Sequence, residues 1–266
     1  MSVRIDRLWP DPVAELDDEQ VLASYAFPED RGWLRMNFVS SLDGAAARAG
    51  RSGGLGDAAD RRVFALLRRP AHAVLVAAGT ARLEGYAAMR LDAESAAWRA
   101  ARGLAPHPVF VLVTRSLDLD PGSPIFGDAP VRPIVYTVGE APASRRAALS
   151  AVADVVDAGE HEVDFARLRG DLAARGLTRV HSEGGPSLFG SMLAAGAVDE
   201  LCLTLAPTLE AGRAPRIAGS PETAPTGTRL ASVLRAEDEL LLRYLRVSGG
   251  TESGNVQPSP AEVGAD

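Results

Sequence analysis

The stretch TRVHSEGGPSLFG, residues 178–190, decides the fold. Its first half is a short run typical of a strand, and Gly184 and Gly185 follow where that strand ends. Glycines let a backbone approach a ligand closely, and Pro186 is pre-set for the first turn of a helix. Unpaired N–H groups at a helix start attract anions. The stretch therefore predicts a phosphate cradle between a strand and a helix, with the carboxylate of Glu183 beside it.

Short apolar runs alternate with amphipathic segments over most of the chain, which is the pattern of an α/β protein. The strands expected are residues 34–39, 73–78, 109–114, 133–138, 154–157, 179–182, 200–206 and 240–247. The helices expected between them are residues 58–69, 93–102, 143–151, 165–175 and 187–195. Helices separate the last strands less regularly, so we expect a mainly parallel sheet with an antiparallel C-terminal edge.

Composition limits the class of protein. The chain has 266 residues, 46% of them hydrophobic, and a net charge of −7, which argues against nucleic acid or an acidic membrane as the main partner. A single cysteine, Cys202, excludes an internal disulfide and a thiolate-rich metal site, and we expect no metal. No apolar run approaches the roughly 20 residues that span a bilayer, and the start lacks a signal-peptide core. The expected compartment is the cytoplasm.

Three segments are expected along the chain. Residues 1–25 form an acidic extension that we expect to pack loosely, and residues 26–248 form one domain. Residues 249–266 contain almost no large apolar side chain, so we expect a disordered tail there.

Polar residues follow two other expected strands. Gly79 and Thr80 stand where a strand ends and a helix begins, so their N–H and hydroxyl groups can hold a phosphate or a carboxamide, although strands often end in Gly-Thr. Asn37, Ser41 and Asp43 end the first strand, where Asp-Gly is equally typical of a plain turn. A carboxylate there can instead accept two N–H bonds from a pyrimidine or pteridine and relay a proton.

A further polar group follows the strand VFVLVT. Thr114, Arg115 and Ser116 suit the 2′-phosphate of NADP better than a free ribose, and Thr137 ends the next strand in a comparable place. A solvated loop arginine is an equal alternative for Arg115. His181-Ser182-Glu183 matches half of a zinc deaminase signature, but the cysteines that the other half requires are absent.

Three segments, taken in order, resemble the reductase domain of the bifunctional riboflavin-biosynthesis deaminase/reductase: MNFVSSLDG, LLRRPAHAVLVAAGTARLEGY and VHSEGGPSLFGSMLAAGAVDELCLTLAPTL. The resemblance covers about residues 35–247. No segment of the sequence resembles the deaminase half of the bifunctional enzyme. It implies a dihydrofolate-reductase-like three-layer fold with helices on both faces of the sheet. It also implies a homodimer that binds NADPH and reduces the ribosyl ring of a phosphoribosylamino-pyrimidine, namely 5-amino-6-(5-phosphoribosylamino)uracil, to a ribitol.

The resemblance also assigns roles to residues. Those implied to contact the cofactor are Gly79, Thr80, Glu84, Gly184, Gly185, Pro186, Ser187 and Leu188. Those implied to contact the substrate are Asn37, Ser41, Ser52 and Arg90, the last displaced by about one residue from the family's phosphate-binding arginine. Asp43 and Glu183 would orient the substrate, and one of them or a water would supply a proton.

Two other functions stay open at this point. A dihydrofolate-type reductase would use the same fold, with Asp43 bonded to a pterin. A nucleotide-binding homologue could keep the cradle and lack turnover, because residues 52–56, SGGLG, replace a loop that in the family often carries an aromatic side chain.

Overall fold

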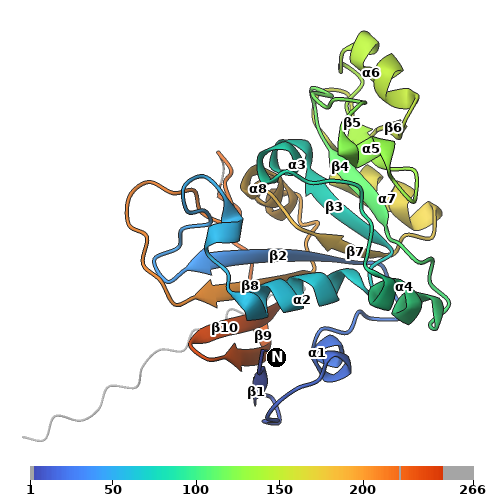
Figure 1. Cartoon of the computed structure of the whole chain (residues 1–266). Coiled ribbons are helices and arrows are strands. Elements are labelled where there is room, and N and C mark those ends of the chain that lie inside the picture. The colour runs from blue at the N-terminus through green and yellow to red at the C-terminus, as the bar shows by residue number, and fades with distance from the viewer. Residues whose placement is uncertain (1–2, 222, 248–266) are drawn as a thin grey trace, which may run out of the picture.

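Ten strands form one mixed sheet in the computed structural model, which describes residues 3–221 and 223–247 (Figure 1). Their order across the sheet is β1-β9-β10-β8-β2-β7-β3-β4-β5-β6. The strands are β1 (Asp6–Trp9), β2 (Trp33–Ser41), β3 (Ala73–Ala77), β4 (Val109–Val113), β5 (Ile134–Thr137), β6 (Asp154–Asp157), β7 (Arg179–Ser182), β8 (Glu200–Ala206), β9 (Thr228–Ala236) and β10 (Glu239–Arg246). The expected tail at residues 249–266 lies outside the described residues.

The sheet divides into a parallel and an antiparallel part. All neighbours from β8 to β6 pair in parallel, whereas β8, β10, β9 and β1 pair antiparallel. The expected α/β class with a mainly parallel sheet and an antiparallel edge is confirmed. β1 and β9 are additional to the expected strands. Both lie at the antiparallel end, where charged side chains interrupt the apolar pattern, as in the sequence TRLASVLRA of β9.

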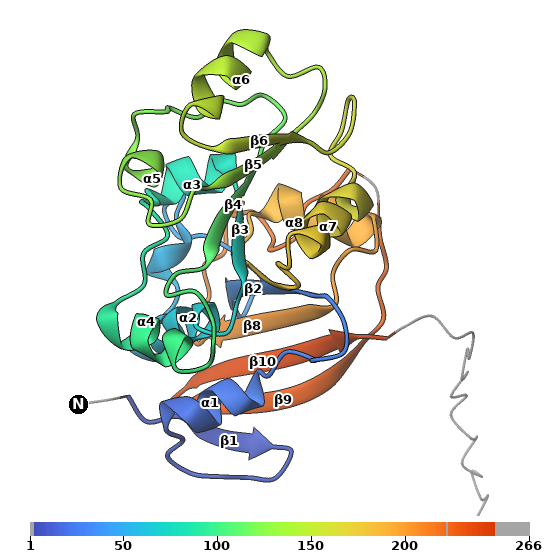
Figure 2. The ribbon, with the colours of Figure 1, turned by 90° about the vertical axis from the view of Figure 1, so that its right-hand side faces the viewer.

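Helices cover both faces of the sheet (Figure 2). They are α1 (Asp18–Ser24), α2 (Ala58–Arg68), α3 (Ala78–Glu84), α4 (Ala93–Ala100), α5 (Pro124–Gly127), α6 (Ala143–Ser150), α7 (Phe165–Ala174) and α8 (Pro186–Ala194). β3 shows how the two faces are built: Leu75 packs in the core beneath α7 and α8, whereas Val74 and Val76 pack in the core beneath α3, α5 and α6. Alternate side chains of a strand point to opposite faces, so a strand buried on both faces is a continuous apolar run.

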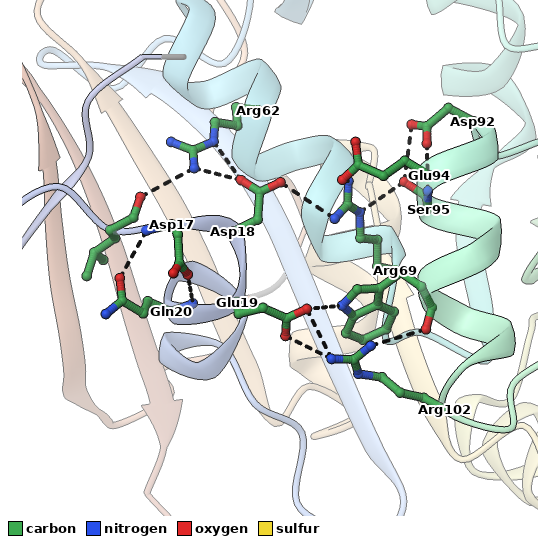
Figure 3. Close-up of polar contacts among 12 residues, drawn as sticks. Asp17, Asp18, Glu19, Gln20, Arg62, Arg69, Asp92, Glu94, Ser95 and Arg102 are labelled. Carbon is green, nitrogen blue, oxygen red and sulfur yellow. Dashed lines mark hydrogen bonds and ion pairs between the residues drawn. The ribbon is translucent and has the colours of Figure 1, made fainter.

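Residues 3–25 belong to the folded body, so the expectation of a loosely packed extension is wrong for this part of residues 1–25. β1 pairs with β9, and Ile5, Val21 and Tyr25 are buried in the core beneath α1 and α2. Figure 3 shows the ion pairs that hold α1 against its neighbours. They join Asp18 to Arg62 of α2 and Glu19 to Arg102, which follows α4. The acidic side chains of α1 thus form ion pairs with arginines that are distant in the sequence.

A buried carboxylate joins the two parts of the sheet. Glu200 at the start of β8 accepts bonds from Trp33 Nε1 at 2.6 Å, Arg35 Nε at 2.7 Å and Arg243 Nε at 2.9 Å. The side chains of Arg35 and Glu200 are both 0% exposed. Burial of charge is costly unless the charges are paired and hydrogen-bonded, as they are here. Among the described residues, no helix combines the length and apolar character needed to cross a membrane.

Replacing Glu200 by alanine should leave Arg35 and Arg243 without their shared counter-ion. We expect the free energy of unfolding to fall by about 3–5 kcal/mol, the cost of breaking a buried pair from one side. Urea denaturation followed by circular dichroism measures this. The control is Glu29→Ala at an exposed position, which should change stability by about 0.5 kcal/mol or less. A loss below about 1 kcal/mol for Glu200→Ala would contradict the structural role of the pair.

Candidate functional site

A cavity of about 550 Å³ opens at the carboxyl ends of the central parallel strands. β7 ends at Ser182, level with Met36 of β2 and Leu75 of β3. β2 continues beyond that point, and its next residues, Asn37, Phe38 and Val39, line the cavity. α2 and α3 form further walls, and Gly185 and Pro186 line it from the α8 side. Ligands of open α/β sheets bind at this edge, so the cavity is the candidate active site.

Gly184 and Gly185, which precede α8, are required because other side chains of the protein pack directly against them. Gly184 has φ +90°, and a Cβ there would lie 2.7 Å from Cζ of Phe38. A Cβ on Gly185 would lie 2.2 Å from Oγ1 of Thr80. No side chain fits at those distances. The glycines therefore bring the start of α8 against β2 and α3, which assembles the cavity from three separate parts of the chain.

Glu183 lies in the cavity wall in a fixed arrangement. Its oxygens accept Nε of Arg68 at 2.6 Å and Nη2 of Arg68 at 2.8 Å, and the Tyr86 hydroxyl donates to Oε2 at 2.8 Å. Burial disfavours the Arg68 cation, but Glu183 outweighs this effect, and the pKa of Arg68 is raised. Burial and Glu183 also raise the pKa of Tyr86, so the phenol keeps its proton. Both Glu183 oxygens are thus occupied by protein donors.

His181 lies behind this group, buried in the sheet. Its Nε2 is 3.6 Å from Oε1 of Glu183, and the side chain is 0% exposed. Burial, with Arg35 and Arg68 nearby, lowers the pKa of His181 well below its ordinary value, so the imidazole is neutral. Within the described residues, no group of three or more His, Cys, Asp or Glu side chains could hold a metal ion.

Asp43 occupies a different position from the one expected of a proton relay. It accepts bonds from the hydroxyl of Ser41 at 2.5 Å and from the backbone N–H groups of Glu210 and Ala211. These bonds, that of Ser41 foremost, lower the pKa of Asp43 to about 2. Neither Ser41 nor Asp43 lines the cavity. The structure therefore makes Asp43 an anchor between two loops, and a carboxyl group that stays ionised is a poor proton donor.

The other expected site residues divide between the cavity and positions outside it. Those that line the cavity are Asn37, Ser52, Thr80, Glu84, Glu183, Gly185 and Pro186. Glu84 Oε1 accepts the backbone N–H of Ser52 at 2.9 Å, which ties the loop after β2 to α3. Arg90 does not line the cavity: it is exposed and donates to the carbonyl of Asp128 at 2.8 Å.

At the start of α8, Ser187 is exposed and Leu188 is buried in the core, so neither forms the cavity wall. Gly79 at the start of α3 is exposed, lies outside the cavity lining and differs from Gly184 and Gly185. A Cβ built on it would meet no atom within 4 Å, so the space before it is open.

A second hollow, of about 410 Å³, lies at the carboxyl ends of β4 and β5. Arg115 and Ser116 line it with Val138, Glu140 and His161. Two expected contributors are absent from its lining. Thr114 accepts the N–H of Leu117 at 3.1 Å, and Thr137 is 0% exposed.

Sequence reasoning missed one face of α2. Asp60, Phe64 and Arg68 follow one another at intervals of four residues, and all three line the cavity together with Arg61. Residues at this spacing share one face of a helix. The signal was present in the sequence, but an amphipathic helix with charged residues on one face is also typical of a solvated surface.

A buried carboxyl group lies beside the first turn of α2. Glu239 at the start of β10 is 1% exposed, and burial, with the Asp57 carboxylate close by, raises its pKa to about 8. Burial also raises the pKa of Asp60, which a hydrogen bond to Thr204 partly opposes. Acidic groups therefore gather beside the first turn of α2, whereas Arg68 lies at the other end of the same helix.

Residues 32–242 match the family model of the RibD C-terminal domain. The chain belongs to this family. It is 32% identical over 184 residues to the 2,5-diamino-6-ribosylamino-4(3H)-pyrimidinone 5′-phosphate reductase of Methanothermobacter thermautotrophicus, covering 69% of this chain and 81% of that protein. It is 28% identical over 187 residues to the reductase of the same name from Archaeoglobus fulgidus, covering 69% of this chain and 84% of that protein.

A solved structure supports the same placement. A pyrimidine reductase-like protein of Corynebacterium diphtheriae superposes with a TM-score of 0.80 at 28% identity, covering 88% of this chain and 100% of that one. The expected resemblance to a riboflavin-pathway reductase domain is confirmed. The matched residues 32–242 include all the residues that line the cavity between β2, α2 and α8.

Substituting Gly185 tests the packing that assembles the cavity. Gly185→Ala should lower the free energy of unfolding by about 1–3 kcal/mol, because its Cβ overlaps Oγ1 of Thr80. Adding Thr80→Ala removes that oxygen and should restore most of the loss, a coupling that a double-mutant cycle measures. The control is Gly79→Ala, which meets open space and should be neutral or slightly stabilising. If the stability losses of Gly185→Ala and Thr80→Ala simply add in the double variant, the overlap between the new Cβ and Oγ1 of Thr80 is ruled out.

Glu239 should make stability depend on pH. The folded state keeps the proton up to a pH of about 8, whereas the ordinary pKa is 4.5, so the free energy of unfolding should fall as pH rises between these values. Glu239→Gln removes the ionisation, so above pH 8 the variant should exceed the parent by up to ~5 kcal/mol, and below pH 4.5 the two should be similar. Urea unfolding at both pH values measures this. The exposed neighbour variant Glu237→Gln should show no such divergence.

Proposed function

We propose that this RibD C-terminal domain is an NADPH-dependent reductase that acts on a phosphoribosylamino-pyrimidine of riboflavin biosynthesis. Membership of the family and the likeness to two reductases of this pathway support the proposal. The observation that carries it is the cavity, which combines an aromatic and apolar lining with charged groups of both signs at the carboxyl ends of parallel strands. A pterin reductase that relies on Asp43 has less support, because that carboxylate lies outside the cavity.

The cofactor is assigned to the side of the cavity nearest α3 and to the second hollow. Open space before Gly79 and the Thr80 hydroxyl at the cavity wall fit a ligand that passes the start of α3. Arg115, whose side chain is 70% exposed, lines the second hollow with a distant ion pair to Glu162 at 3.8 Å. A flexible arginine with a weakly held partner fits a 2′-phosphate. When bound there, NADPH supplies the hydride for the reduction.

The substrate is assigned to the wall formed by α2 and β2. Arg61 is an exposed cation at the cavity, and among the described residues it forms no ion pair within 4 Å. Its Nη1 donates to the carbonyl of Gly56 at 3.3 Å, and the rest of the guanidinium is available for the substrate phosphate, the role that the sequence assigned to Arg90. Glu183 acts as a positioning residue: it fixes Arg68 and the neutral Tyr86 hydroxyl at the wall against which the reacting carbon would lie.

Asn37 of β2 adds an amide to the wall opposite α2, where it can hold a polar edge of the substrate. The Glu84 link to the loop after β2 keeps Ser52 at the mouth of the cavity and limits entry of water. The homodimer and the cytoplasmic location expected from the sequence remain predictions.

A direct assay tests the proposal. The purified chain is incubated with NADPH and 2,5-diamino-6-ribosylamino-4(3H)-pyrimidinone 5′-phosphate, and loss of nicotinamide absorbance is followed. We expect turnover with this substrate, and a larger rise in melting temperature with NADPH than with NADH. Binding of NADPH without oxidation by any pyrimidine would favour the non-catalytic homologue, and absence of NADPH binding would overturn the proposal.

The two candidate phosphate-binding arginines can be separated by substitution. Arg61→Gln should raise KM for the phosphorylated substrate by about 10- to 100-fold with a smaller effect on kcat, because a charge-assisted contact to the phosphate is lost. Arg90→Gln is the matched control and should change KM by about 3-fold or less, because Arg90 lies outside the cavity lining. A larger rise in KM for Arg90→Gln than for Arg61→Gln would assign the phosphate contact to Arg90.

A further inference from the structure

Three carboxylates line the cavity: Asp60, Glu84 and Glu183. Two of them are engaged with protein donors. Glu183 has both oxygens occupied by Arg68 and Tyr86, and Glu84 holds the backbone N–H of Ser52. A carboxylate whose lone pairs are already used has little capacity left for the N–H groups of a ligand.

Asp60 differs from the other two. Its protein partner is the hydroxyl of Thr204, and within residues 3–221 and 223–247 no arginine lies within ion-pair distance of its carboxylate. The half-buried side chain lies over Gly56, where a Cβ would come within 2.1 Å of Oδ2, so a glycine is needed for the carboxylate to occupy this place. Asp60 is thus held at the wall with acceptor capacity to spare.

Apolar side chains line the cavity together with Asp60. Phe64 stands one turn further along α2, and Ala46, Ala47 and Pro215 line the cavity with it. A planar heterocycle placed there would rest on apolar surface and present one polar edge to Asp60. The two donors that match a carboxylate side by side are a ring N–H and an adjacent exocyclic amino group, as in a 2-amino-4-oxopyrimidine.

We propose that Asp60 accepts the ring N–H and the 2-amino group of the substrate and so selects a 2-amino-4-oxopyrimidine over a uracil. The inference rests on the proposed function and names the substrate within it: 2,5-diamino-6-ribosylamino-4(3H)-pyrimidinone 5′-phosphate rather than 5-amino-6-(5-phosphoribosylamino)uracil. A uracil places a carbonyl oxygen where the amino group would be, and this oxygen faces the carboxylate as a second acceptor. Selection therefore combines a gained bond with a repulsion.

Equilibrium binding of the two nucleotides, measured by calorimetry with NADP⁺ present, tests this without requiring turnover. The parent should bind the diaminopyrimidinone at least about 10-fold more tightly than the uracil, and Asp60→Asn should remove most of that preference. Thermal unfolding and NADP⁺ affinity of Asp60→Asn should stay close to those of the parent. The matched control is Asp57→Asn on the same turn, which retains a helix-capping side chain, lies outside the cavity lining and should preserve the preference.

Dihydrofolate, which carries the same 2-amino-4-oxo edge without a ribose phosphate, is the third ligand. Equal binding of both nucleotides by the parent, or a preference that survives in Asp60→Asn, would overturn the role of Asp60 and leave the reductase assignment standing. Selective binding without NADPH oxidation would support Asp60 and overturn the assignment. Tight binding of dihydrofolate alone, lost in Asp60→Asn, would support the contact but replace the substrate by a pterin. A chain that binds none of the three ligands would overturn both proposals.

Discussion

The absence of side chains at Gly184 and Gly185 is the constraint on which the cavity depends. Phe38 and Thr80 approach these positions so closely that any Cβ would overlap them. β2, α3 and the start of α8 can meet only because the chain between β7 and α8 is bare backbone there. The space beside the two glycines is therefore filled by Phe38 and Thr80. The cavity that a ligand could occupy is lined by Phe38, Phe64 and Pro186.

Charge around this floor is arranged in pairs that compensate burial. Glu183 binds Arg68 and Tyr86 on the cavity side of the sheet, and Glu200 binds Arg35 and Arg243 further along β2. Arg35 lies opposite His181 in the pairing of β2 with β7. Burial, with the cations of Arg35 and Arg68 nearby, keeps that imidazole neutral, which avoids a third buried positive charge. Against this closed arrangement, Asp60 and Arg61 stand out as charged groups with capacity for a ligand.

Much of the fold could be predicted because its strands are short apolar runs buried on both faces. Residues 154–157, 179–182 and 200–206 form strands at the expected limits, and the first strand begins one residue before and ends two residues after the expected range. β1 and β9 escaped prediction because charged residues interrupt the apolar residues of each, and each gains its order from pairing at the sheet edge. Glu183 was expected to face the substrate, but its partner Arg68 is 115 residues away in sequence, and no local pattern could indicate that bond.

The sequence by itself determined the alternation of strands and helices, the glycine pair before α8 and the family. These features depend on side-chain periodicity and on backbone freedom at single positions, both of which are local. Only the tertiary structure decided which charged groups bond to other protein groups and which can still bind a ligand. Asp43 and Asp60 are both aspartates near the first strands, yet backbone donors from residues 210 and 211 satisfy the first, and the second faces the cavity. That difference arises from chain segments brought together by folding, because a carboxylate is free or occupied according to the donors around it.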